Sequence, residues 1–83
     1  MRYRARIEVS LKPGYSDPEG NATKKSLVEL QYDVESVKVS KVYRIVLNSD
    51  SYESVRKTLD EMCKRLLANP TRDEYDIQIE GSL

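Results

Sequence analysis

RYRARIEVSLK, residues 2–12, decides the fold, because polar and apolar side chains alternate along it without interruption. A period of two is typical of a β-strand with one buried and one exposed face. The apolar face would carry five side chains, Tyr3, Ala5, Ile7, Val9 and Leu11. The stretch therefore predicts a strand that packs on a core through one face and exposes a charged face.

The residues after this strand predict a turn and the start of a helix. Pro13 and Gly14 end the strand, because proline cannot donate to a ladder and glycine admits turn angles. Asp17 before Pro18 is typical of a helix N-terminus, where aspartate accepts a hydrogen bond from a free backbone N–H. The helix has only a narrow apolar stripe, made of Thr23, Leu27 and Leu30. We therefore expect it to hold by docking on the sheet.

Residues 34–47, VESVKVSKVYRIVL, are rich in β-branched side chains and are predicted to be extended. The preferred interpretation is two strands joined at residues 40–42, and the alternative is one long bent strand. Val42 and Val46 are apolar on the face that would otherwise be polar, which indicates cover on both sides. Two helices can cover only one face, so we expect the second cover to come from another subunit.

Residues 50–68 carry the strongest helical pattern. Its apolar stripe consists of Val55, Leu59, Met62, Cys63, Leu66 and Leu67. Asp50 and Glu53 have capping-box spacing, with Asp50 as the expected cap, and Asn69 before Pro70 is expected to end the helix. A last alternating strand follows, with an apolar face of Tyr75, Ile77 and Ile79.

The resulting order is β-α-β-β-α-β, which predicts an α+β fold over one domain, residues 1–83. The expected architecture is a ferredoxin-like two-layer sandwich, an antiparallel sheet with both helices on one face. The first and last strands are neighbours in that fold. The outward row Arg2, Arg4 and Arg6 would then lie near the row Asp76, Gln78 and Glu80. Opposite charges across strands would stabilise that pairing.

The amino-acid composition predicts a domain with no catalytic activity of its own. The chain has no histidine, which is the commonest general base and the usual partner of a serine or cysteine nucleophile. Its one cysteine, Cys63, lies on the apolar stripe and is predicted to be a core residue. Asp17 and Glu19 are interpreted as helix-start residues rather than a metal pair. We expect no catalytic, metal or cofactor-binding residue.

The charge balance indicates which classes of partner to expect. Fourteen basic and fourteen acidic residues leave no basic excess of the kind that nucleic-acid binders show. No apolar run reaches a membrane span, and the N-terminus lacks the apolar block of a signal peptide, so a cytoplasmic location is the default. A small core and six tyrosines favour association with other protein chains.

Four segments, taken in this order, resemble the PurS family, the small subunit of phosphoribosylformylglycinamidine (FGAM) synthase. They are VSLKPGYSDPEG (9–20), VESVKVSK (34–41), EMCKRLLANP (61–70) and DEYDIQIE (73–80). The resemblance covers nearly the whole chain. The chain departs from the family's pattern at Ser40, at Tyr15-Ser16 and at Thr71-Arg72.

The resemblance implies a non-catalytic subunit of an ATP-dependent amidoligase in purine biosynthesis. Its partners would be a PurL-like synthetase, which carries the ATP and magnesium, and a PurQ-like glutaminase. The subunit would bridge them, support ammonia transfer and associate with itself as a dimer or tetramer. We expect the partner interface to include Lys12, Tyr15, Asp17, Val42, Val46 and Asn69. The alternative is a stand-alone ferredoxin-like regulatory or RNA-binding module, with the arginine row as its ligand contact.

Overall fold

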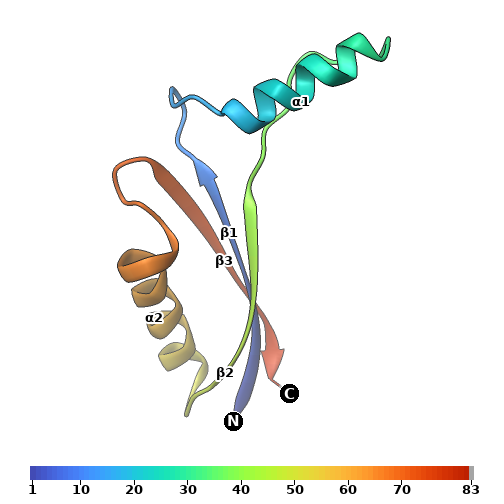
Figure 1. Cartoon of the computed structure of the whole chain (residues 1–83). Helices are drawn as coiled ribbons and strands as arrows, with labels where there is room; N and C mark the ends of the chain where they lie inside the picture. The colour runs from blue at the N-terminus through green and yellow to red at the C-terminus, as the bar shows by residue number, and fades with distance from the viewer. Residues whose placement is uncertain (83) are drawn as a thin grey trace.

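A three-stranded antiparallel sheet forms the body of the protein in a computed structural model that describes residues 1–82 (Figure 1). β1 (Arg2–Leu11) is the middle strand, and β2 (Lys41–Asn48) and β3 (Asp73–Ser82) are the two edges. α1 (Pro18–Glu29) connects β1 to β2. α2 (Tyr52–Met62) continues into one π-helical turn, η1 (Cys63–Leu67), before β3. The α+β class, the antiparallel sheet and the two helices are confirmed.

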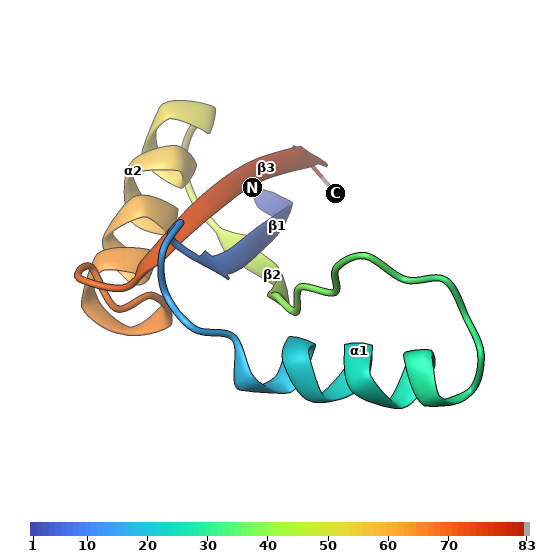
Figure 2. The ribbon, with the colours of Figure 1, turned by 90° about the horizontal axis from the view of Figure 1, so that it is seen from above.

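The core lies between the sheet and α2, which covers one face of it (Figure 2). The alternation that predicted the first strand is confirmed, because Ala5 and Ile7 are fully buried. α2 contributes three side chains with no exposed surface: Val55, Leu59 and, at its end, Cys63. The prediction that Cys63 is a core residue is therefore confirmed. Burial raises the pKa of its thiol, which disfavours the reactive thiolate.

The end of the long helix differs from the prediction because it contains a π turn. The N–H of Ala68 donates to the carbonyl of Cys63, five residues back, at 2.9 Å. The extra residue moves the inward positions on to Leu67 and Ala68, so Leu66 points out and is 83% exposed. The expected cap is also wrong: the Ser51 hydroxyl, not Asp50, accepts from the N–H of Ser54 at 3.1 Å. Serine and aspartate are comparable caps, so sequence spacing could not choose between them.

The hairpin preferred at residues 40–42 does not form. Residues 33–40 are extended without a strand partner and run directly into β2 (Figure 1), as in the alternative of one long bent segment. The reason is the register: the last pair between β1 and β2 is Val9 with Lys41. Residues 33–40 lie beyond that pair, and the N–H of Val39 donates to the Asp17 carboxylate, which holds this segment beside the start of α1 rather than beside β2.

The prediction that the first helix docks on the sheet is wrong. α1 projects from one end of the sheet, away from α2, and its only buried residue is Gly20 (Figures 1 and 2). We call residues 17–40, which comprise α1 and the extended return segment, the arm. The radius of gyration is 16.3 Å, whereas a compact chain of this length would have roughly 12 Å. The narrow stripe of α1 is too small to hold the helix on the sheet.

The first and last strands are neighbours, as predicted, but their charged rows do not pair one to one. Arg6 lies opposite Gln78, and Glu8 lies opposite Asp76. A register shift after Arg4 displaces the remaining positions. Arg6 instead pairs with Glu8 of its own strand, Nη1 to Oε1, at 3.3 Å. No ion pair joins β1 to β3 within residues 1–82.

We expect Leu59→Ala to lower the free energy of unfolding by about 2–5 kcal/mol, because Leu59 is fully buried and truncation leaves a cavity. Lys57→Ala, on the exposed side of the same helix, is the control and should change it by less than about 0.5 kcal/mol. Urea unfolding at a fixed protein concentration measures both. Equal effects of the two substitutions would contradict this placement of the core.

Candidate functional site

Four of the six predicted interface residues meet at one end of the sheet. The Lys12 ammonium donates to the carbonyl of Pro70 at 2.8 Å, and the Tyr15 hydroxyl donates to the carbonyl of Thr71 at 3.1 Å. The backbone N–H of Lys12 also donates to the carbonyl of Arg72, at 2.8 Å. These bonds join the loop after β1 to the loop before β3. We call residues 12–17 and 69–72 together the end cluster.

Asn69 shapes the second loop of the end cluster. Its side-chain oxygen accepts from the N–H of Thr71 at 3.0 Å, and its own N–H donates to the Asp73 carboxylate at 2.9 Å. Asn69 and Lys12 therefore use polar groups to build the loops. Tyr15 is different, because its hydroxyl is bonded while much of its side chain stays exposed. An exposed tyrosine on a fixed loop is a residue type favoured at protein interfaces.

At the end of the sheet, the Asp17 carboxylate links the start of α1 to the end of the extended return segment. One carboxylate oxygen accepts from the N–H of Gly20 at 2.9 Å, and the other accepts from the N–H of Val39, also at 2.9 Å. These two bonds, that from Gly20 first, lower the pKa of the Asp17 carboxyl. A side chain at position 20 would place its Cβ 2.4 Å from the carbonyl oxygen of Val37. Only glycine allows the helix and the return segment to approach so closely.

Val42 and Val46 lie elsewhere, on the face of the sheet opposite α2. Both are exposed and lie on either side of Arg44 on edge strand β2. Arg4 of β1 lies opposite Val46, and Glu8 lies opposite Val42. This face therefore presents an apolar pair within a charged surround. The structure divides the six predicted residues between two separate surfaces.

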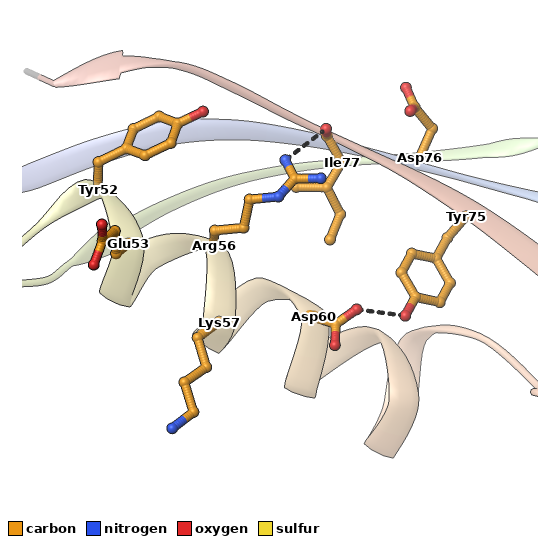
Figure 3. A pocket seen from close by; sticks show the side chains of 8 residues that line it. All are labelled: Tyr52, Glu53, Arg56, Lys57, Asp60, Tyr75, Asp76 and Ile77. Atoms are coloured by element: carbon orange, nitrogen blue, oxygen red, sulfur yellow. Dashed lines mark hydrogen bonds between the residues drawn. The ribbon is translucent and has the colours of Figure 1, made fainter.

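Sequence reasoning missed a cleft of about 490 Å³ between α2 and β3 (Figure 3). The Tyr75 hydroxyl donates to Asp60 across it at 2.6 Å, and Lys64 pairs with the same carboxylate at 2.9 Å. The bond lowers the pKa of Asp60 and raises that of Tyr75. Arg56 reaches the carbonyl of Ile77 on the outer strand at 3.5 Å (Figure 3). Only the alternation of Tyr75 signalled its inward position; its partner depends on how α2 crosses β3.

A second cavity, of about 380 Å³, lies between the end of α2 and β2. We call it the α2 groove. Apolar side chains form most of its wall, and Glu61 and Arg65 stand beside them. The other lining residues are Ile45, Thr58, Met62, Leu66 and Leu67. The sequence placed Leu66 in the core, so this groove was also missed.

No group of three or more histidine, cysteine, aspartate or glutamate side chains that could hold a metal ion is found among residues 1–82. In the same range no helix is long and apolar enough to span a membrane. The Tyr75 hydroxyl and the Asp60 carboxylate are bonded to each other. The arrangement is suited to contact with other proteins.

Comparison with known proteins agrees with this description. A family model described as PurS, phosphoribosylformylglycinamidine (FGAM) synthase, matches residues 4–81. The FGAM synthase subunit PurS of Archaeoglobus fulgidus is 42% identical over 74 residues, which cover 88% of this chain and 92% of that protein.

Solved structures show the same fold. The crystal structure of Methanocaldococcus jannaschii PurS, one of the subunits of formylglycinamide ribonucleotide amidotransferase, is 34% identical, with a TM-score of 0.87. The match covers 98% of this chain and 99% of that one. A chain of the Thermotoga maritima PurLQS structure has the same TM-score at 21% identity, covers 95% of this chain and 98% of that one, and supports the fold alone.

We expect Asp17→Ala to speed amide hydrogen exchange at Gly20 and Val39, because both N–H groups lose their acceptor. Amides paired between β1 and β3 should keep their rates. Glu19→Ala, which removes a neighbouring carboxylate, is the control. Exchange followed by NMR measures the effect, and unchanged protection at Val39 in the Asp17 variant would contradict the assigned role.

The pH dependence follows from the lowered pKa of Asp17. Its stabilising contribution is fully present above the usual carboxyl value of 3.8 and is lost as the pH falls through the lower folded value. The ratio of exchange rates between variant and wild type at Val39 should therefore fall toward one in acid.

Proposed function

The chain belongs to the PurS family of FGAM synthase subunits, and from this membership we propose that it bridges a PurL-like synthetase and a PurQ-like glutaminase. The assembled enzyme would convert formylglycinamide ribonucleotide, glutamine and ATP to FGAM in purine biosynthesis. The small subunit would hold the two larger ones so that ammonia passes between them. The observation that carries this proposal is the family match over residues 4–81.

The side-chain chemistry supports a joining role. The chain has no histidine to act as a base, and its only thiol, that of Cys63, is buried. We therefore propose that ATP and magnesium bind to the synthetase and that this chain binds no cofactor. The family's place in purine biosynthesis supports a cytoplasmic location.

Surplus surface supports association with other chains, including copies of this one. The accessible surface is 6373 Å², about a quarter more than the roughly 5,100 Å² expected of a folded monomer of this mass. The excess exceeds the roughly 800 Å² that each partner buries in a standard interface. Residues 33–40 also form no strand in the described chain, so another strand or loop can pair along this segment. We propose a dimer or tetramer.

Two separate surfaces suit a bridging subunit. The end cluster presents Tyr15 at one end of the sheet, whereas Val42 and Val46 present an apolar pair on the open face. We propose that these two surfaces, with the six residues predicted from the sequence, contact partner subunits. The arginine row gives less support to an RNA-binding module, since Arg6 is paired with Glu8.

We expect glutamine-dependent FGAM synthesis to drop when this chain is omitted from a mixture of its synthetase and glutaminase. Synthesis from added ammonium should persist, because the synthetase then needs no transfer from the glutaminase. The two rates, measured with and without the chain, test the proposal. Equal glutamine-dependent rates would reject the bridging role, and RNA binding by the isolated chain that is lost in Arg4→Ala would favour the alternative module.

A further inference from the structure

We propose that the outer edge of β3 binds an extended segment of a partner subunit in which every second side chain is basic. The segment would add a fourth strand to the sheet, because β3 has no strand partner on its outer side among residues 1–82. This inference rests on the bridging role proposed above and deepens it by naming the chemistry of the segment that a partner would supply.

The outer edge of β3 presents backbone groups that β1 does not use. The N–H of Lys12 donates to the carbonyl of Arg72 at 2.8 Å, in line with the register of β1 and β3. Along an antiparallel strand, groups that face a neighbour alternate with groups that face away from it. The even-numbered residues of β3 therefore bond to β1, and the odd-numbered ones direct their N–H and C=O groups outward, where a further strand can pair with them. These outward residues are Tyr75, Ile77 and Ile79.

The cleft between α2 and β3 lies beside this outer edge (Figure 3). The carbonyl of Ile77 faces the cleft, and Arg56 of α2 reaches it at 3.5 Å. The N–H of an added strand would bond the same carbonyl at about 2.9 Å and could replace this long contact. The ring of Tyr52 lies at one end of the cleft and that of Tyr75 at the other (Figure 3). The inward side chains of the added strand would thus lie between two tyrosines, a residue type favoured at interfaces.

The open face of β3 is acidic along its length. Asp76 points away from α2 (Figure 3), and it lies opposite Glu8 of β1, which carries the same charge. No ion pair within residues 1–82 includes a carboxylate of this row. Basic side chains at alternate positions of an added strand would lie beside the row, and opposite charges across strands stabilise their pairing. The exposed residues of the row are Glu74, Asp76, Gln78 and Glu80.

A second copy of β3 does not fit this edge. Antiparallel pairing of two copies about Ile77 would put Glu74 of one opposite Glu80 of the other. Pairing about Tyr75 would put Glu74 opposite Asp76. Like charges directly opposite each other are destabilising. The acidic row therefore disfavours pairing between copies, as charges on edge strands do, and selects a strand of opposite charge.

Two synthetic peptides as long as β3 test the charge preference. Both have valine at every second position, and the positions between carry lysine in one and glutamate in the other. We expect the lysine peptide to bind the full chain and to slow amide exchange at Tyr75, Ile77 and Ile79, followed by NMR. Asp76→Lys should weaken this binding roughly fivefold. Glu29→Lys makes the same charge change on exposed α1 and should leave it unchanged. Equal affinities for the two peptides would overturn the proposal.

The partner subunits give a second measurement. Exchange at the same three amides should slow when the chain is mixed with its synthetase and glutaminase. Unchanged exchange there, in a mixture whose glutamine-dependent synthesis requires the chain, would overturn the docking at β3 and leave the bridging role intact. Synthesis that does not require the chain would reject the bridging role, and this docking with it.

Discussion

The carboxylate of Asp17 is the constraint on which the shape of this protein depends. By accepting from Gly20 and Val39 it joins two segments that are far apart in the chain and fixes the direction of α1. Because α1 then lies off the sheet, one helix is left to cover three strands. The surplus surface, the open groove and the position of residues 33–40 outside the sheet all follow from that placement.

The sequence predicted those parts of the fold that depend on residues close together in the chain. The alternation in residues 2–12 identified the middle strand, and the stripe around Leu59 identified α2 and the burial of Cys63. The position of α1 could not be read in this way. Asp17 was recognised as a helix cap, but its second hydrogen bond reaches a residue 22 positions away, and no spacing rule contains that information.

The candidate surfaces were also predicted only in part. Lys12, Tyr15, Asp17 and Asn69 were predicted as contact residues, and the structure brings them to one end of the sheet. The two cavities beside α2 were missed because each depends on tertiary geometry. The Tyr75–Asp60 bond needs the crossing of α2 over β3, and the exposure of Leu66 needs the π turn.

The π turn at Cys63–Leu67 places one large apolar side chain on the outside without disturbing the interior. A regular helix one residue shorter would still turn Leu67 and Ala68 inward after Cys63. The additional residue is accommodated on the solvent side, where it leaves Leu66 outside. One additional residue in this turn therefore changes which large apolar side chain at the end of α2 faces outward, while the buried positions on either side stay filled.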